Sequence, residues 1–350
     1  MNTNGIKKKR ILFITTGGTI ACRDKGRGLA PELTPEELLA AVPGLDKVCD
    51  VTAYPLFRLD STDMTPDRWL KLAGLVYDAM PDRYDGYVIT HGTDTLAYAA
   101  ATLACQLQHS DKPIVLTGSQ LPLEALGSDA PGNLRDAFTW ALTPGARGVR
   151  VVFAGRVIRG LRVRKRHTTD MDAFESVGCA DSAVIRDGQV IRMGQTAQDA
   201  VVTDSPFLPP VRLYRSLNVR IALVHLTPGL DPEVVWQMGN GLKALIVEGV
   251  GIGGIPESLT PVLTRLAVSG VRLVLTSQVP YGVCDFTVYR AGRRIGEAIE
   301  SEAEAAPVAV TARDVPTEAA FAAAMYALAR EEEGLSFAEQ FRAALEDADL

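Results

Sequence analysis

Hydrophobic and polar positions follow two different periods along the first half of the chain. Short, nearly continuous apolar runs at 11–15 and 113–117 are typical of strands that are buried on both faces. Between such runs, apolar residues recur at helical spacing, so that Trp69, Ala73 and Val76 share one face of a predicted helix. The repeated order of strand, helix and strand predicts an α/β fold with a doubly wound, mostly parallel sheet of the flavodoxin or Rossmann type.

The other elements of this region follow from the same patterns and from helix-end signals. Strands are expected at 51–57, 87–90 and 149–154, and helices at 95–107 and 133–142. A further helix is expected to begin after Thr34, because Pro35 suits the first helical position and Glu37 completes a capping box. Strands of this region are therefore separated by helices, as a parallel sheet requires.

The alternation of strands and helices breaks after residue 155. Residues 156–195 are predicted to form antiparallel ribbon, with a hairpin turn at Asp187-Gly188. Residues 196–218 contain three prolines and are interpreted as a linker. We therefore expect a larger N-terminal domain over 1–195 and a smaller C-terminal α/β domain over 219–350.

The C-terminal region returns to alternating strands and helices. Strands are predicted near 220–226, 243–248 and 271–276, with helices between them. Two helices complete the chain, one beginning at Pro316 and one at Ser336, where Glu339 completes a second capping box. The C-terminal domain is thus expected to hold a small sheet of its own.

Composition and charge exclude several classes of protein. The 350 residues include 36 basic and 42 acidic side chains, so the net charge of −6 provides no basic field for nucleic acid. No apolar run is long enough to span a membrane. The 5 cysteines are scattered without a C-x-x-C pair, and the apolar run after Lys7–Arg10 is too short for a secretion signal. We expect a reduced, cytoplasmic protein with no membrane or nucleic-acid partner.

Polar residues cluster directly after each of the first four predicted strands. The clusters are rich in glycine and hydroxyl side chains: Thr16-Gly17-Gly18-Thr19, Asp60-Ser61-Thr62-Asp63, His91-Gly92-Thr93-Asp94-Thr95 and Thr117-Gly118-Ser119-Gln120. In a parallel sheet these positions meet at the carboxyl edge, where ligands bind in open α/β folds. Each cluster alone is compatible with ordinary turn and cap chemistry. Four clusters at one edge predict a ligand site.

Several kinds of chemistry have no support in the sequence. The 4 histidines lack the spacing of a zinc site, and neither a dinucleotide fingerprint nor a phosphate-binding loop is present. The nucleophile elbow of serine hydrolases is also absent. His91 lies in the third cluster, and we interpret it as a packing or hydrogen-bonding residue rather than a general base. The sequence therefore favours an enzyme that uses a hydroxyl nucleophile and no cofactor or metal.

A hydroxyl nucleophile needs a base, and one basic segment offers a candidate. Lys165 lies between Arg164 and Arg166, and neighbouring cations lower the pKa of a lysine, which then accepts a proton more readily. Arginine stays protonated, so Lys165 and His167 are the candidate bases of this segment. A solvated basic hairpin is the alternative interpretation, and the segment alone does not exclude it.

Together these motifs resemble the bacterial-type L-asparaginase family. Thr16–Ile20 and His91–Thr95 resemble its two signature sequences, and Asp60–Met64 resembles its substrate-binding turn. Further segments match in order and spacing over essentially the whole chain: 117–122, 165–174, 248–251 and 276–278. The sequence of residues 119–122 and the lack of a secretion signal resemble the cytoplasmic type I branch most.

The resemblance implies a catalytic set of four residues. Thr19 is expected to attack the side-chain amide of L-asparagine and form a covalent acyl-enzyme, which water hydrolyses to L-aspartate and ammonia. Thr93, Lys165 and Asp94 are expected to form a second hydroxyl–lysine–carboxylate set, in which Lys165 draws a proton through Thr93. The resemblance implies no cofactor and no metal.

The resemblance also implies a substrate-binding set and a quaternary structure. The substrate-binding residues are expected to be Asp60, Ser61, Thr62, Gly92, Asp94 and Ser119. Backbone N–H groups at Gly18 and Thr93 are expected to stabilise the oxyanion. The site is expected in an inter-domain cleft that a neighbouring subunit completes, in a homodimer or homotetramer.

The chain departs from the family pattern in the loop that follows the first motif. Many members carry a tyrosine there, whereas residues 20–53 contain none and Gly28–Pro31 lies in the corresponding place. Thr62 also lies where a glutamine is often found. Alternatives therefore stay open: a broader glutaminase–asparaginase, the amidase component of a tRNA-dependent amidotransferase, or a catalytically weak amino-acid-binding protein on the same scaffold.

Overall fold

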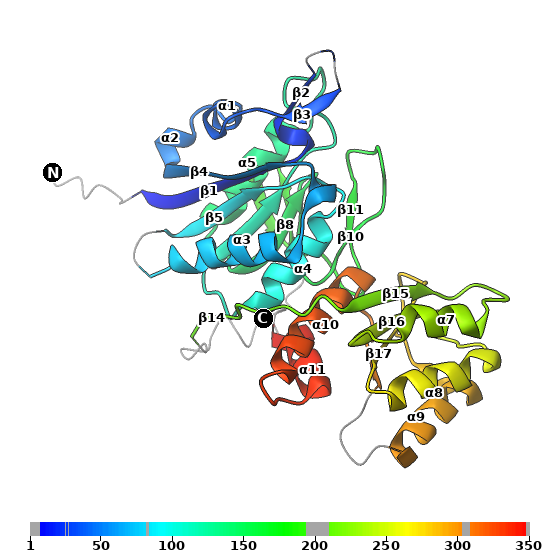
Figure 1. Ribbon diagram of the computed structural model, residues 1–350. Helices are drawn as coiled ribbons and strands as arrows, with labels where there is room; N and C mark the ends of the chain where they lie inside the picture. The colour runs from blue at the N-terminus through cyan, green and yellow to red at the C-terminus, as the bar shows by residue number, and fades with distance from the viewer. Residues whose placement is uncertain are drawn as a thin grey trace. The chain divides into compact units, whose positions relative to one another are not determined.

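The structure of the chain is a computed structural model, and it describes residues 8–24, 26, 28–81, 84–193, 210–302 and 309–347. The described chain divides into two units, whose elements are labelled in Figure 1. Unit 1 contains the described residues up to Arg215 except Val177–Cys179. Unit 2 contains Val177–Cys179 and Ser216–Asp347.

An eight-stranded sheet is the centre of unit 1. In spatial order its strands are β13 (Gln189–Arg192), β12 (Ala183–Arg186), β9 (Arg156–Arg159), β8 (Gly148–Phe153), β7 (Pro113–Thr117), β5 (Gly86–Thr90), β1 (Lys9–Gly17) and β4 (Cys49–Leu59). The five strands from β8 to β4 are parallel to one another. Taken in chain order, these five strands have the 2-1-3-4-5 arrangement of flavodoxin-like folds. The predicted doubly wound, mostly parallel sheet is confirmed.

The strand order reverses between β1 and β5. The second parallel strand, β4, lies on one side of β1, and the third, β5, lies on the other side. Open α/β sheets bind their ligands at such a switch point, outside the carboxyl ends of the strands. A ligand site is therefore expected at the loops that leave β1 and β5.

Helices cover both faces of this sheet (Figure 1). One face carries α1 (Pro35–Ala40), α2 (Leu45–Val48) and α5 (Ala130–Leu142), and the other carries α3 (Pro66–Asp78) and α4 (Leu96–Gln106). Successive residues of β1 point to alternate faces, so Ile11 and Phe13 pack in one core with Phe138 of α5. The nearly continuous apolar run of β1 is thus explained by helices on both sides.

End signals in the sequence fix where two of these helices begin. The Thr34 hydroxyl accepts from the Glu37 N–H at 3.3 Å, and the Glu37 carboxylate accepts from the Thr34 N–H at 2.8 Å. The predicted capping box is therefore confirmed. Helix α5 begins at Ala130 rather than at residue 133, because its first turn accommodates Pro131, which needs no N–H partner there.

The predicted antiparallel ribbon is confirmed, and most of it extends the main sheet. β9 pairs antiparallel with both β8 and β12, and β12 pairs with β13 through the predicted hairpin. Asp187 and Gly188 have positive φ angles of 51° and 74°, as this tight turn requires. β10 (Val163–Lys165) and β11 (Phe174–Ser176) form a separate two-stranded ribbon.

Two short pairings of unit 1 are not predicted by the sequence patterns. β2 (Cys22–Asp24) pairs with β3 (Leu29–Pro31), and β6 (Leu107–Gln108) pairs with β14 (Arg212–Leu213). β14 falls inside the predicted linker, of which residues 196–209 lie outside the described residues. The predicted domain boundaries at 195 and 219 stay a prediction.

Unit 2 is built around a four-stranded parallel sheet. Its strands, in spatial and chain order, are β15 (Ile221–His225), β16 (Ala244–Gly249), β17 (Arg272–Ser277) and β18 (Ala309–Thr311). The helices are α7 (Pro232–Gly239), α8 (Thr260–Val268), α9 (Arg290–Glu302), α10 (Thr317–Glu331) and α11 (Phe337–Asp347). The predicted small C-terminal α/β sheet is confirmed, together with the two final helices. In the part of the chain that the structure describes, no helix is both long and apolar enough to cross a membrane.

Candidate active site

The four polar clusters meet at the carboxyl ends of their strands. In the strand registers, Thr15 is opposite Thr90, and Thr90 is opposite Thr117. On the other side of β1, Gly17 is opposite Leu59, immediately before the second cluster. The clusters after β1 and β5 lie at the switch point of the sheet.

Glycines allow the first and third clusters to touch through their backbones. Gly18 has a φ of 79°, which favours glycine, and a Cβ at this position would collide with the Cα and N atoms of Gly92. Thr19 and Thr93 each follow directly on one of these two glycines. The two threonines of the signature motifs are therefore carried by loops in direct contact.

The second and fourth clusters join the same assembly. A Cβ on Gly92 would lie 2.6 Å from the Oγ of Ser61, and a Cβ on Gly118 would collide with the carbonyl oxygen of His91. The Gly18 N–H donates to the carbonyl oxygen of Leu59 at 2.8 Å. This backbone amide, expected as an oxyanion donor, thus already has a partner in the structure.

Lys165 is the last residue of β10, and its ammonium group reaches the third cluster. The Nζ atom donates to the Thr93 Oγ1 at 2.9 Å and to the Asp94 Oδ1 at 2.5 Å. Thr93 is 5% exposed, whereas the Asp94 side chain is 59% exposed. These three residues form one hydrogen-bonded group in which the hydroxyl is buried and the carboxylate is open to solvent.

The segment that follows Lys165 is attached to the fourth cluster. The Gln120 side-chain amide donates to the carbonyl oxygens of Thr168 and Asp170, both at 3.0 Å. Arg166 pairs with the carboxylate of Asp172, which compensates the charge of this neighbour of Lys165. Gln120 thus holds this segment beside the fourth cluster, a role that its position in the sequence does not predict.

Thr19 begins a short 3-10 helix, η1 (Thr19–Ala21), and is partly buried. Ile20 and Ala21 are buried in the core of unit 1, which anchors this helix. Among the described residues, the Thr19 hydroxyl has no hydrogen-bond partner, and no hydrogen bond joins it to Thr93 or Lys165. The hydroxyl is therefore available to an incoming molecule.

Apart from Gly92 and Asp94, described above, the expected substrate-binding residues divide into three kinds. Ser61 is buried against Gly92, and its hydroxyl has no partner among the described residues. Asp60 and Thr62 are exposed, and the Asp60 Oδ1 accepts from the Thr62 N–H at 2.9 Å and from its hydroxyl at 2.8 Å. Ser119 is buried and donates its hydroxyl proton to the carbonyl oxygen of Leu121, within its own loop.

Two family models match the chain. The model for the N-terminal domain of asparaginases matches residues 10–198, and the model for the C-terminal domain of glutaminases and asparaginases matches residues 220–341. The chain belongs to the L-asparaginase family. It is an amidohydrolase of that family, as the resemblance of its motifs implied.

Relatives and known structures support this membership. An L-asparaginase from Thermococcus kodakarensis is 35% identical over 294 residues, covering 83% of this chain and 86% of that protein. A glutamyl-tRNA(Gln) amidotransferase component from Pyrococcus furiosus is 34% identical over 300 residues, covering 81% of this chain but 66% of that protein. The thermostable L-asparaginase structure from Thermococcus kodakarensis aligns with a TM-score of 0.84 and 32% identity, over 97% of this chain and 99% of that one. The probable cytoplasmic L-asparaginase of Campylobacter jejuni aligns with a TM-score of 0.77 and 26% identity, over 97% and 100%.

Thr95 belongs to the second signature motif, and only the structure reveals its role. Its hydroxyl donates to the carbonyl oxygen of Ser61 at 2.7 Å. This bond ties the second cluster to the third and sets the position of the Ser61 backbone. The sequence shows that Gly92–Thr95 contains a second hydroxyl. It does not reveal the partner of this hydroxyl, which is 34 residues away in the chain.

We expect Thr95→Val to raise the KM for an amino-acid amide about tenfold while kcat changes less. The variant keeps the shape of the side chain and removes the bond that holds Ser61, which is one of the expected substrate-binding residues. Thr102→Val is the matched control, because the buried Thr102 hydroxyl of α4 has no partner among the described residues. Equal KM values for the two variants would contradict this role of Thr95.

His91 is a buried, neutral residue of the third cluster. It is 1% exposed, and its Nδ1–H donates to the Gly92 carbonyl oxygen at 2.8 Å, which leaves the buried Nε2 without a partner among the described residues. Burial disfavours the charged imidazole and lowers the pKa of His91 to about 4. The structure agrees with the interpretation of His91 as a packing and hydrogen-bonding residue.

His91 is expected to affect stability in acid more than catalysis. Because the pKa is lower in the folded chain than in the unfolded one, His91 contributes stability above pH 6.5 that is lost as the pH falls toward 4. From pH 7 to pH 5 this loss amounts to about 2 kcal/mol. We expect His91→Gln to lose correspondingly less unfolding free energy over that interval in urea titrations, and to keep kcat within about tenfold at pH 7. A larger fall in kcat that follows a titration near pH 4 would mean that His91 acts as a base.

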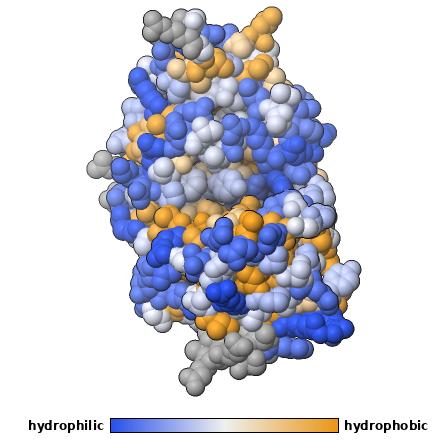
Figure 2. Space-filling model, turned by 45° about the vertical axis from the view of Figure 1, so that its right-hand side comes forward, coloured by the Kyte–Doolittle hydropathy of each residue, from blue (hydrophilic) through white to orange (hydrophobic). Residues whose placement is uncertain are grey.

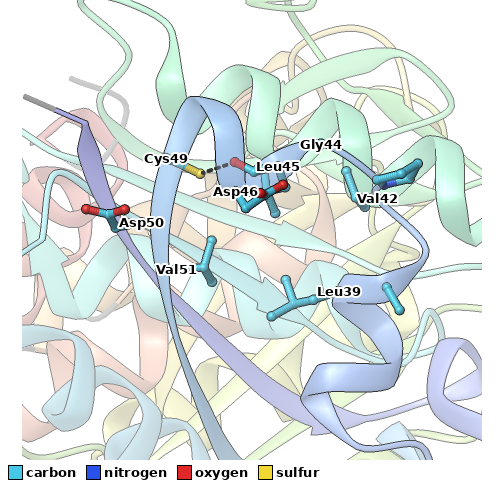
Figure 3. Close-up of a pocket in the computed structure, with 10 residues that line it drawn as sticks. Leu39, Val42, Gly44, Leu45, Asp46, Cys49, Asp50 and Val51 are labelled. Atoms are coloured by element: carbon cyan, nitrogen blue, oxygen red, sulfur yellow. Dashed lines mark hydrogen bonds between the residues drawn. The ribbon is translucent and has the colours of Figure 1, made fainter. Parts of the chain in front are cut away.

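Two other features of the described residues are separate from this site. No group of three or more histidine, cysteine, aspartate or glutamate side chains in the described ranges could hold a metal ion. A cavity of about 480 Å³ lies between α1, α2 and β4 (Figure 3), lined by Leu39, Ala40, Val42, Pro43, Gly44, Leu45, Asp46, Cys49, Asp50 and Val51. Burial raises the pKa of its Cys49 thiol to about 11, so this thiol stays protonated at neutral pH. The cavity contains none of the candidate active-site residues.

Proposed function

We propose that the protein hydrolyses L-asparagine to L-aspartate and ammonia through a threonine nucleophile. One observation carries this proposal: Lys165 binds both Thr93 and Asp94, on a loop in backbone contact with the loop of the unpartnered Thr19 hydroxyl. A nucleophile, a proton relay and a carboxylate anchor are the groups that acyl transfer from a small zwitterionic amide requires.

In the first half-reaction, the Thr19 oxygen attacks the side-chain amide carbon. Thr93 accepts the proton that Thr19 loses and passes its own hydroxyl proton to the Lys165 amine, so the relay activates the nucleophile. The carbon–nitrogen bond then breaks. The nitrogen takes up the relayed proton and leaves as ammonia, and an aspartyl ester of Thr19 remains.

In the second half-reaction, water attacks the ester carbon. The same Thr93–Lys165 relay accepts the proton of the water molecule and returns it to the departing Thr19 oxygen. The bond between Thr19 and the aspartyl group breaks, L-aspartate is released and the free hydroxyl is restored. The net reaction consumes one water and one amide, so no cofactor is needed.

Polar groups of two loops are proposed to hold the substrate. The exposed Asp94 carboxylate suits an α-ammonium group, and the Ser61 hydroxyl suits an α-carboxylate. Thr62 and Asp60 form an exposed pair beside Ser61 and contribute to the same end of the substrate. Gly92, which has no side chain, allows its loop to approach Ser61 closely, and Ser119 supports the neighbouring loop.

The Thr93 amide is proposed as the main oxyanion donor. Its N–H has no acceptor among the described residues, whereas the Gly18 N–H already donates to Leu59. A donor without a partner can bind the oxyanion without first breaking another hydrogen bond. Gly18 is proposed to position Thr19 through its close backbone approach to Gly92 and to have a smaller part in oxyanion binding.

The assay that tests this function is ammonia release from L-asparagine, L-glutamine and D-asparagine. Turnover of L-asparagine well above that of the other two amides supports the proposal. Equal turnover of L-glutamine would favour a glutaminase–asparaginase, or an amidase function like that of the amidotransferase relatives. If the native protein releases no ammonia from any amide, the enzyme proposal is wrong, and binding of amino acids without turnover would then favour a binding protein.

A homodimer or homotetramer is proposed as the working form, in the cytoplasm as for the type I branch. Hydrophobic side chains reach the surface between polar ones on the face that Figure 2 shows. In unit 2, exposed apolar residues follow the carboxyl ends of β16 and β17: Val250, Ile252, Val279, Tyr281, Val283, Val288 and Tyr289. Exposed apolar side chains in such number are typical of a contact between subunits. Light scattering after gel filtration is expected to give at least twice the mass of one chain, and a monomer at assay concentration would contradict the proposal.

A further inference from the structure

A cluster of three charged side chains next to the nucleophile has no place in the mechanism above. Arg23 lies in β2, four residues after Thr19. Its Nε donates to both carboxylate oxygens of Glu124, at 3.0 and 3.1 Å. Its Nη2 donates to the Glu124 Oε1 at 2.6 Å and to the Glu37 Oε1 at 2.9 Å. One guanidinium thus binds two carboxylates at once.

The two carboxylates come from segments that are already fixed. Glu37 belongs to the first turn of α1, and its second oxygen accepts from the Thr34 N–H in the capping box. Glu124 lies in the loop after β7, in the turn where the Ala125 N–H donates to the carbonyl oxygen of Pro122. This loop continues the fourth polar cluster. Arg23 therefore links β2 to a helix and to a loop at the site.

These interactions are stronger than an ordinary exposed ion pair. A single pair at the surface contributes little, but a bidentate arginine shared by two carboxylates is the exception. The bond from Thr34, followed by that from Arg23, lowers the pKa of Glu37, and the bonds from Arg23 lower the pKa of Glu124. Both carboxylates are therefore ionised at neutral pH, when Arg23 is charged.

Two hydrogen bonds connect the start of β2 and the end of η1 to the backbone of Gly18, directly before Thr19. The Cys22 thiol donates to the carbonyl oxygen of Gly18 at 3.3 Å, and the Ala21 N–H donates to the same oxygen at 3.0 Å. Gly18 is also the residue whose backbone touches Gly92. A shift of β2 would therefore move the Gly18–Thr19 peptide relative to the Thr93 loop.

We propose that Arg23 is a positioning residue for Thr19, which acts by holding β2 against Glu37 and Glu124. This inference rests on the proposed function, because it assumes that Thr19 is the nucleophile. Residues 20–53 contain no tyrosine, and ion pairs of Arg23 anchor the segment that follows Thr19. Orientation of the reacting oxygen affects the chemical step more than substrate binding.

The test compares Arg23→Gln with Arg272→Gln in the full-length protein. Arg272 forms a similar pair with Glu331 in unit 2, through Nε at 2.9 Å and Nη2 at 2.5 Å, and is comparably exposed. Arg23→Gln is expected to lower kcat for L-asparagine about tenfold or more and to leave KM within about threefold, whereas Arg272→Gln leaves both unchanged. Arg23→Lys is expected to recover part of kcat, and Glu124→Gln is expected to add little to Arg23→Gln. Equal kcat values for native protein and Arg23→Gln would overturn the proposal, and so would an equal loss in Arg272→Gln.

Hydrogen exchange separates this proposal from the proposed function. Arg23→Gln is expected to speed amide exchange in residues 18–24 about tenfold without changing α10. Unchanged exchange in residues 18–24 would show that Arg23 does not order them, whatever the activity. If the native protein releases no ammonia from any amide, the proposed function fails, and faster exchange in the variant would still assign the anchoring of this segment to Arg23.

Discussion

Thr19→Ala is expected to lower kcat for L-asparagine by at least about 10³-fold, because it removes the oxygen that we propose forms the acyl-enzyme. The Thr19 hydroxyl has no partner among the described residues, so the substitution breaks no hydrogen bond that the structure shows. Thermal unfolding of the variant is accordingly expected within a few degrees of the native midpoint. Ammonia release at saturating asparagine measures the loss in kcat.

Two controls make this result specific to the nucleophile. Thr19→Ser keeps an attacking hydroxyl and is expected to retain activity within about a hundredfold. Thr16→Val removes a hydroxyl that donates to the carbonyl oxygen of Thr90 at 2.8 Å, and is expected to keep kcat within about tenfold. Acid quenching of the native enzyme during turnover should leave the aspartyl group on a peptide that contains Thr19. An aspartyl group found on a peptide with Thr93 instead would assign the attack to the other threonine.

Lys165→Met is expected to lower kcat by about 10²–10⁴-fold with a smaller change in KM. Methionine has a similar length but no proton to exchange, so Thr93 loses its partner in the relay. The expected loss corresponds to about 3–5 kcal/mol of transition-state stabilisation. Steady-state kinetics of the native protein and the variant over a range of L-asparagine concentrations tests it, because the range separates the change in kcat from the change in KM.

Lys112→Met is the matched control for this lysine. The Lys112 Nζ donates to the carbonyl oxygen of Met80 at 2.9 Å, a structural bond that the mechanism does not use. The kcat of the Lys112→Met variant is expected to stay within about threefold of the native value, because no group of the relay changes. If Lys165→Met also stays within tenfold of native, which is about 1.4 kcal/mol, Lys165 is not the base.

Much of the fold follows from patterns that are local in the sequence. The apolar run of β1 and the capping box at Thr34 depend on residues within one turn or one strand, and both are predicted correctly. β18, at three residues, is too short to carry a period, and its strand character comes from pairing with β17. The short β2–β3 pairing is not predicted from the sequence for the same reason.

The approximate location of the site could also be predicted, because topology alone brings the ends of parallel strands to one edge. The hydrogen-bond partners within the site could not be predicted from the sequence. Lys165 and Thr93 are 72 residues apart, and their contact depends on how the β10–β11 ribbon packs beside the sheet. In the same way, the sequence did not reveal that the Gly18 N–H is already bonded to Leu59 or that the Ser119 hydroxyl faces its own loop.

The glycine contacts at the switch point limit how the specificity of this scaffold can be redesigned. Gly18 touches Gly92, and Gly92 touches Ser61, so any side chain introduced at either glycine would push apart the loops that hold the two threonines. Enlarging the site for longer amides by changing these loops would therefore disturb the nucleophile and the relay together. Thr62 is exposed and outside these contacts, which makes it the practical position for libraries that aim to change the preferred amide.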